Sequence, residues 1–281
     1  MRALVISGGG SKGAFAGGIA QYLIEAKGIE YDLFIGTSTG SLLLTHLALG
    51  AIDKLHSIYK EVDEHQIFNL NPFVKRKKNG ITQLSIHHFN VIRSFIRGNK
   101  TFGESKRLRS FLQQNITVFE FEKLKKSQLN ILITVANLTL NRIEYKSIKD
   151  CSYEDFIDWI WISANYIPFM SLVKKNGYEY ADGGLGSVVS IDKAIELGVS
   201  EIDVIVLRQE NNEGIRNATT NPFDLMLNMF SFSLDRIENQ NIELGLLKAE
   251  KKGVQVNLYY TPSLLTQNAL LFDKKRMLRW W

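Results

Sequence analysis

A serine lies between two glycines in the segment Gly36-Thr37-Ser38-Thr39-Gly40, a spacing that is typical of a serine nucleophile at a strand-to-helix turn. The apolar segment 31–35 before it predicts a short buried strand, and the segment 41–50 after it predicts a buried helix that ends at a glycine. Such a turn presents the serine hydroxyl at the helix N-terminus, where partial positive charge favours an oxyanion. We therefore expect Ser38 to be a nucleophile, and the alternative for it is a helix N-cap without chemistry.

A second motif, Gly8-Gly9-Gly10-Ser11-Lys12-Gly13, follows a strand predicted at residues 3–7 and precedes a small-residue-rich helix at 14–24. Glycines in this position let backbone N–H groups converge on one negatively charged atom. Two uses fit the loop: it supplies oxyanion donors to Ser38, or it binds a dinucleotide, whose glycine fingerprint it matches. A dinucleotide site needs an acid at the carboxyl end of the second strand. Asp32 stands at the start of that strand, so we favour the oxyanion donors.

The histidines do not supply an obvious base to take the proton from Ser38. They are His46, His56, His65, His87 and His88, and none follows residue 88. An α/β-hydrolase places its histidine after the acid, late in the chain, so this distribution excludes that class. His46 lies roughly 12 Å along the predicted helix from Ser38, which favours a core position, and the adjacent His87 and His88 stay as a minor alternative.

The composition indicates an ordinary globular protein, since 45% of the 281 residues are hydrophobic and 22% are charged. The single cysteine, Cys151, excludes an internal disulfide framework and a cysteine-rich metal site, and it fits a reducing compartment. No secretory signal precedes the first predicted strand, and no uncharged apolar run reaches membrane-spanning length. We expect a cytoplasmic protein. Neither a metal nor another cofactor is implied, because no His, Cys and acid cluster has ligand spacing.

The remaining elements alternate between strands and helices, which predicts a single α/β domain over residues 1–281. We expect three layers, with a mainly parallel sheet that carries helices on both faces. Strands are predicted at 130–137, 141–145, 177–180, 202–207 and 254–260, and helices at 153–163, 190–197 and 223–252. Ser190 is expected to cap the second of these helices.

The core of this domain is expected to comprise about residues 1–60 and 130–260. Residues 61–126 are expected to form a helical basic cap with turns at 75–80 and 97–107.

Positive charge is concentrated in the cap region. Residues 71–130 contain thirteen Lys or Arg side chains and three Glu, so the rest of the chain is net negative although the whole chain carries +5. Such a cluster faces solvent, anionic lipid headgroups or nucleic acid, and nucleic acid comes last because no nucleic-acid-binding signature accompanies it. The basic tail 274–281 ends in Trp280-Trp281, which suits a bilayer interface. Peripheral contact with an anionic membrane and a solvated surface remain open alternatives.

Three motifs now stand in a fixed order: the glycine loop, the serine turn and Asp182-Gly183-Gly184. Together they resemble the three motifs of patatin-like phospholipases. The resemblance also includes segments 133–138 and 162–168, and it covers about residues 1–60 and 130–207.

The resemblance implies a patatin-like three-layer fold and a lipid acyl hydrolase with a Ser–Asp dyad and no histidine. By position it makes Ser38 the nucleophile and Asp182 the base, with Lys12 holding the loop or contacting a headgroup phosphate. The oxyanion hole would lie around Gly8, Gly9 and Gly10, with the Thr39 N–H as a further donor.

The expected reaction is the hydrolysis of fatty-acyl esters in phospholipids or lysophospholipids, through an acyl-enzyme on Ser38. The expected partner is a lipid or acyl-ester substrate, and the residues single out no headgroup, acyl-chain length or oligomeric state. The alternative from another class is a catalytically inactive lipid-binding module of the same fold. A nucleotide-binding protein is a distant third.

Overall fold

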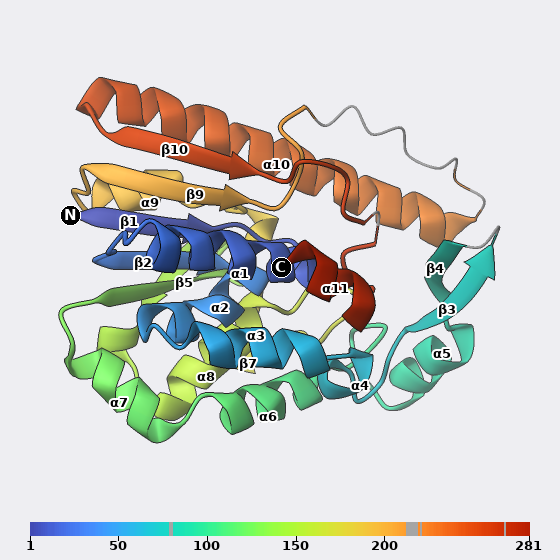
Figure 1. The fold of residues 1–281 in the computed structure, drawn as a ribbon. Helices are drawn as coiled ribbons and strands as arrows, with labels where there is room; N and C mark the ends of the chain where they lie inside the picture. The colour runs from blue at the N-terminus through green and yellow to red at the C-terminus, as the bar shows by residue number, and fades with distance from the viewer. Residues whose placement is uncertain (79–80, 212–218, 220, 267) are drawn as a thin grey trace.

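The computed structural model describes the whole chain except residues 79–80, 212–218, 220 and 267. The described part is a three-layer α/β structure in which helices cover both faces of one large mixed sheet (Figure 1). The expected fold class is therefore confirmed.

The main sheet contains eight strands among the described residues, in the order β10-β9-β1-β2-β5-β8-β7, with β6 also paired to β5. The strands are β1 (Arg2–Ile6), β2 (Leu33–Thr37), β5 (Asn130–Asn137), β6 (Arg142–Ser147), β7 (Val173–Lys175), β8 (Tyr178–Asp182), β9 (Glu201–Val206) and β10 (Gln255–Tyr260). The strands from β10 through β5 run parallel, whereas β6, β7 and β8 form antiparallel pairs. The carboxyl ends of the parallel strands share one edge, where sites form in sheets of this kind.

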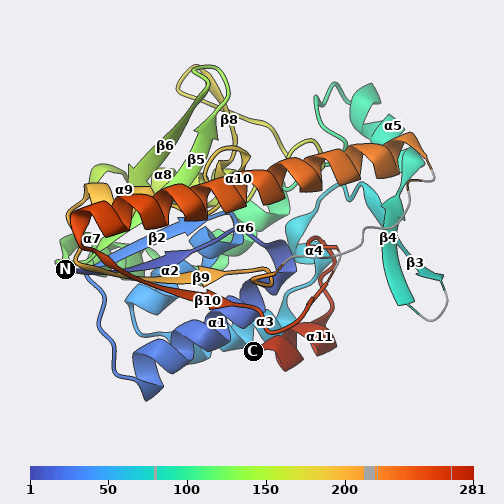
Figure 2. The same cartoon turned by 90° about the horizontal axis from the view of Figure 1, so that it is seen from above.

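Successive side chains of the central strands enter two different cores, as the twofold period of a strand requires. In β1, Leu4 and Ile6 join the larger core, whereas Ala3 and Val5 join the smaller one. The larger core packs under α1 (Gly13–Gln21), which continues as a π-helical turn (Tyr22–Ala26), α2 (Thr39–Ala48), α3 (Ile52–Glu61), α6 (Lys106–Asn115), α7 (Val118–Lys126) and α8 (Tyr153–Ser163). The smaller core packs under α9 (Ile191–Glu196) and α10 (Pro222–Lys252), and α10 runs the length of the sheet (Figure 2).

The cap differs from the expected helical insertion, because its basic segment is a strand. The antiparallel ribbon of β3 (Phe73–Lys78) and β4 (Ile81–Ile86) occupies the place where a turn was expected at 75–80. Phe73 and Ile86 pair at its base and are buried, which anchors the ribbon. A two-stranded ribbon that projects into solvent needs few other apolar positions, and this is why its sequence lacks the usual alternation.

The rest of the cap divides between the ribbon and the core. Helices α4 (Glu64–Ile67) and α5 (His88–Ile96) accompany the ribbon, whereas α6 and α7 bury Leu108, Leu112, Phe121 and Leu124 in the larger core. Because α6 begins at Lys106, the basic turn expected at 97–107 ends before that residue.

The expected cap of α9 is corrected by the structure, and the tail is found against α1. Ser190 precedes α9, but its side chain does not cap it and instead lies 2.9 Å from the Ser187 hydroxyl. The tail forms α11 (Lys274–Trp280), and the Trp281 ring packs on Gly17 of α1 and donates from Nε1 to Gln21 Oε1 at 2.8 Å. The Trp281 side chain is therefore held against α1.

No helix in the described ranges combines the length and the hydropathy that a bilayer crossing requires.

Candidate active site

Ser38 occupies a sharp turn between β2 and α2. Its backbone has φ 54° and ψ −123°, a strained combination for a residue with a side chain. A Cβ on Gly36 would lie 2.6 Å from the carbonyl carbon of Gly40, and a Cβ on Gly40 would lie 2.3 Å from Ile6 O. The two glycines are needed because the strand, the turn and the helix approach one another at backbone contact distance.

The side chain of Ser163, for which the sequence predicted no role, holds this turn. The main-chain N–H of Ser38 donates to Ser163 Oγ at 2.9 Å, and the Ser163 hydroxyl donates to Thr134 O at 2.7 Å. Ser163 ends α8 and is fully buried. The relay connects the strained residue to the neighbouring strand β5, so α8 positions Ser38 through one hydroxyl.

The ends of strands β2 and β8 meet on one edge of β5, while β6 pairs with the other edge of β5. On the shared edge, Thr37 of β2 pairs with Thr134, and Asp182 of β8 pairs with the next residue, Val135. The strands β2 and β8 run toward each other along this edge, since one is parallel and the other antiparallel to β5. Ser38 follows Thr37, so the pairing brings Ser38 and Asp182 together at one point of the sheet.

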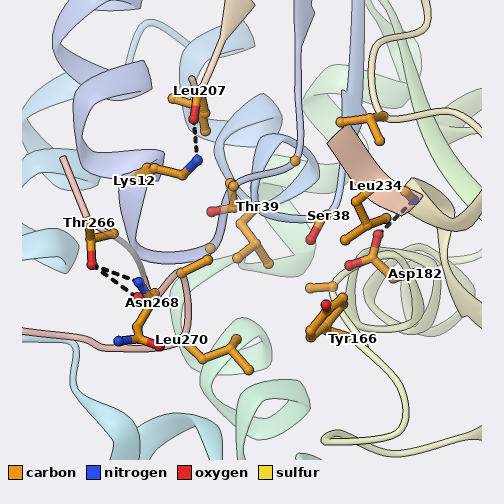
Figure 3. Close-up of a pocket in the computed structure, with 18 of the residues that line it drawn as sticks. Lys12, Ser38, Thr39, Tyr166, Asp182, Leu207, Leu234, Thr266, Asn268 and Leu270 are labelled. Carbon is orange, nitrogen blue, oxygen red and sulfur yellow. Dashed lines mark hydrogen bonds between the residues drawn. The ribbon is translucent and has the colours of Figure 1, made fainter. Parts of the chain in front are cut away.

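The Asp182 carboxyl group is buried beside Ser38, and the two side chains face each other in the cavity (Figure 3). Oδ1 accepts the N–H of Gly184 at 2.8 Å. Burial raises the pKa of Asp182 to about 7, while the Ser38 hydroxyl and the Gly184 N–H partly oppose this by favouring the charged form. A carboxyl group with a pKa near neutrality is suited to accept a proton at ordinary pH.

The glycine loop borders the same point. A Cβ on Gly8 would lie 3.2 Å from Ser38 Cβ, so the loop passes directly beside the serine. Gly10 has φ 58°, and a Cβ there would lie 2.2 Å from the main-chain oxygen of Ala269. The same oxygen accepts the N–H of Ser11 at 2.7 Å. The segment around Ala269 therefore fixes the loop from outside the sheet.

Several amide N–H groups around Ser38 are available for an oxyanion. Within the described part of the chain, no acceptor receives the N–H of Gly9, Gly10 or Thr39. All three residues line the cavity together with Gly8. The structure thus groups the residues expected at the oxyanion hole around Ser38.

Lys12 lies apart from Ser38, and its Nζ donates to the Leu207 carbonyl oxygen (Figure 3). Burial lowers the pKa of Lys12. Near it, Arg208 Nε lies 2.9 Å from Glu238 Oε2, and burial raises the pKa of Glu238 to about 7 although both cations lower it. Of the two roles expected for Lys12, this geometry favours holding the loop against the end of β9.

The histidines lie away from the reacting groups. His46 is buried in α2, with Nε2 3.1 Å from Asn115 O, as expected for a core residue. His87 Nδ1 accepts the N–H of Asn90, and the ring of His88 contacts Phe223. His46 lines the distal part of the cavity, whereas the other histidines do not line it.

Asp32 also falls outside the site. It accepts the Arg2 N–H at 2.7 Å at the amino end of β2, on the edge of the sheet opposite the glycine loop. The dinucleotide arrangement is therefore not formed.

A cavity of about 1120 Å³ contains the candidate dyad, and it is slightly larger than most ligand pockets. It extends to both sides of the sheet edge. Toward α2, α3 and α6 its walls are apolar and include Leu42, Leu55, Ile58, Leu108 and Leu112. Toward α10 its walls are mixed: polar side chains such as Arg208, Glu238 and Asn239 lie there together with apolar ones such as Leu227, Phe232 and Leu234. The described residues offer no group of three His, Cys, Asp or Glu side chains that could hold a metal ion.

The chain is similar to one protein family and to individual known proteins. A model of the family described as patatin-like phospholipase matches residues 4–195. Over 65 residues the chain is 35% identical to a protein of Escherichia coli named "cUMP-AMP-activated phospholipase", and the match covers 21% of this chain and 20% of that protein. Among solved structures, VipD from Legionella pneumophila aligns with a TM-score of 0.46 and 13% identity, over 81% of this chain and 52% of that chain. The matches thus span a fifth of the first protein and about half of the second.

Proposed function

Because the chain belongs to the patatin-like phospholipase family, we propose that it hydrolyses fatty-acyl ester bonds of phospholipids or lysophospholipids with a Ser38–Asp182 dyad. The observation that carries this proposal is the meeting of the strained Ser38 with the buried Asp182 inside a large cavity. No histidine is needed in this scheme, since a carboxyl group with a raised pKa can receive the serine proton itself.

In the proposed reaction, Ser38 Oγ attacks the ester carbonyl carbon while its proton passes to the Asp182 carboxylate. The carbonyl oxygen becomes an oxyanion, which the N–H groups of Gly9, Gly10 and Thr39 stabilise. When the intermediate collapses, the alkoxide of the lysophospholipid or glycerophosphodiester product leaves and takes the proton from Asp182. Water then attacks the acyl-enzyme while Asp182 accepts its proton, and collapse of the second intermediate returns that proton to Ser38 Oγ as the fatty acid is released.

The two sides of the cavity fit the two ends of such a substrate. The apolar side under α2, α3 and α6 can hold an acyl chain, because burying methylene groups there removes apolar surface from water. It ends near His46 and Asn115, about 12 Å along α2 from Ser38 at the rise of an α-helix. The mixed side along α10 can hold the headgroup, whose oxygens and charge need partners such as Arg208 and Asn239.

The experiment that tests this proposal combines labelling with product analysis. A fluorophosphonate ester should label the wild-type protein, and Ser38→Ala should abolish the label and all turnover. A panel of phospholipids and lysophospholipids with different headgroups then identifies the substrate by the fatty acid released. A folded wild-type protein that binds lipid, yet takes no label and releases no fatty acid, would instead be the inactive lipid-binding module.

The proposal places the reaction in a reducing compartment, the cytoplasm, because the one cysteine in the sequence carries no disulfide. Redox state of the Cys151 thiol in the purified native protein is the corresponding measurement.

A further inference from the structure

Helix α5 turns large apolar side chains outward. Phe89, Ile92, Phe95 and Ile96 are between 49% and 81% exposed, although α5 has only nine residues. On a helix, positions 89, 92 and 96 fall on one side, because residues three and four apart are neighbours. The opposite side buries Val91 and Ser94. The helix α5 therefore carries apolar side chains on its exposed side as well as on its buried side.

Basic side chains border this outward stripe. Arg93 and Arg97 follow Ile92 and Ile96 by one residue each, and both are exposed. Arg76 is exposed on the adjoining ribbon. None of these three arginines forms an ion pair with a side chain that the structure describes.

The first half of α10 continues the same surface. From Pro222 to Ile237 no residue is buried, and Leu225, Met229 and Phe232 are exposed. Phe223 at the start of α10 contacts the rings of His88 and Phe102. In both views α5, the ribbon and this end of α10 gather at one end of the molecule, while α7 lies at the other (Figures 1 and 2).

The apolar surface reaches the cavity that contains Ser38. Phe232 is 63% exposed and also lines the cavity, and Leu264 is likewise exposed and lines it. Apolar side chains of the outer surface therefore also form part of the wall of the cavity that contains Ser38.

We propose that α5 and the first half of α10 form a docking surface for an anionic lipid bilayer, at the mouth of the cavity. This inference rests on the proposed function and adds the physical form in which the substrate is met. An apolar stripe edged by arginines matches the boundary between acyl chains and anionic headgroups. Arg76, Arg93 and Arg97 supply the charge complementarity, because a bilayer rich in phosphatidylglycerol offers phosphates with which these guanidinium groups can pair.

The test is vesicle binding by variants that keep the core intact. Phe89→Ser with Ile96→Ser removes two exposed apolar groups, and Arg93→Gln with Arg97→Gln removes the bordering charge. On phosphatidylcholine vesicles that contain phosphatidylglycerol, each double variant should bind about tenfold or more weakly than wild type. Raised salt should weaken wild-type binding, and vesicles of phosphatidylcholine alone should bind weakly.

A matched control uses α7, at the other end of the molecule. Phe119 is 78% exposed there, and Lys123 is also exposed, so Phe119→Ser with Lys123→Gln removes similar chemistry from a different surface. This control should bind vesicles like wild type. Hydrolysis of dissolved p-nitrophenyl butyrate should be the same in all these variants, because the ester reaches Ser38 from solution.

Three outcomes would overturn the inference. The α5 variants bind anionic vesicles as tightly as wild type; the α7 control loses binding equally; or wild type forms a dimer in light scattering that the α5 variants abolish, which would assign the surface to a second copy. Failure of the proposed function is separate, since it would show as absent butyrate hydrolysis and absent fluorophosphonate label in wild type.

Discussion

The main-chain N–H of Ser38 donates to Ser163 Oγ at 2.9 Å, and this bond spans two elements that are far apart in the sequence. Ser38 has a backbone conformation that a side chain seldom adopts, so it needs an external restraint. Ser163 provides this restraint, because its hydroxyl is itself fixed by donation to Thr134 O.

Ser163→Ala should therefore lower kcat on butyrate about tenfold with little change in KM, since a buried N–H and a buried carbonyl lose their partner. The free energy of unfolding should fall by about 1–3 kcal/mol. Ser94→Ala is the matched control, because Ser94 is also a buried helical serine that donates to a carbonyl, that of Thr101. It should lose similar stability in urea unfolding while kcat stays unchanged. Equal kcat in both variants would contradict a positioning role for Ser163.

Replacing the proposed base separates the dyad from a histidine mechanism. Asp182→Asn keeps the shape of the side chain but cannot accept the serine proton, so turnover should fall about 10²–10⁴-fold. The double variant His87→Ala with His88→Ala should keep substantial turnover of butyrate, because neither ring lines the cavity. If the histidine double variant is folded but inactive while Asp182→Asn stays active, the base is a histidine of the cap and not Asp182.

The pH dependence of turnover follows from the raised pKa of Asp182. The base must be charged to act, and burial raises its pKa to about 7, so the active fraction falls as the pH drops through that value. We expect kcat/KM for butyrate to decrease about tenfold per pH unit below about pH 7 and to level off above it. Stopped assays over a pH series measure this decrease. A decrease of kcat/KM that begins only near pH 3.8, the ordinary pKa of an aspartic acid, would exclude a buried base.

The Asp182 carboxyl group should make the folded protein less stable as the pH rises, although the rising pH increases its activity as a base. The pKa of Asp182 is raised above its ordinary value of 3.8, so between about pH 4 and pH 7 the folded protein retains a proton that the unfolded chain has lost. The contribution of this group to the free energy of unfolding therefore declines across that window and stays low above it. Asp182→Asn never ionises, so its stability relative to wild type should improve by up to about 4 kcal/mol between about pH 4 and pH 8. Urea unfolding of both proteins at the two pH values measures the difference, and a constant difference would contradict it.

The glycine loop offers a prediction with an internal control. Gly10 and Gly28 both have positive φ, 58° and 65°, so an alanine at either position pays a similar backbone strain. Only at Gly10 would the new Cβ meet a neighbour, Ala269 O at 2.2 Å, whereas nothing lies within 4 Å at Gly28. Gly10→Ala should lower turnover a hundredfold or more by displacing oxyanion donors, consistent with about 3 kcal/mol for one such donor. Gly28→Ala should lose about 1 kcal/mol of stability and no turnover.

Local chemistry in the sequence predicted much of this fold. The strand 130–137 and the helix 153–163 have the bounds that their apolar patterns indicate, because both are buried runs bounded by polar residues. Gly36 and Gly40 on either side of Ser38 were also predictable, since the close approach of the backbones there admits only glycine. The resemblance to a family located Asp182, which the residues alone did not identify as a base.

The remaining features depend on contacts between distant segments. The ribbon of β3 and β4 was not predicted, because an exposed two-stranded ribbon needs no apolar alternation and its basic residues suggested a turn. The role of Ser163 follows only from the way α8 passes behind the serine turn, although it lies in a segment similar to the family. The ring of Trp281 in the tail fits against Gly17, a contact that no local pattern indicates.

The meeting of β2 and β8 on one edge of β5 has a consequence for how such a protein can change. A slip of β8 by one residue would turn Asp182 to the opposite face of the sheet, so the dyad tolerates no change of register. Insertions in the cap lengthen the chain between Ser38 and Asp182, and exchanges alter its sequence, but neither changes the pairing of β2 and β8 with β5. The proposed dyad depends on the strand pairings of the sheet, whereas the proposed docking surface lies on α5 of the cap and on the first half of α10. The two can therefore diverge separately, and a chimera that carries a foreign cap should keep the chemistry while it changes the membrane it acts on.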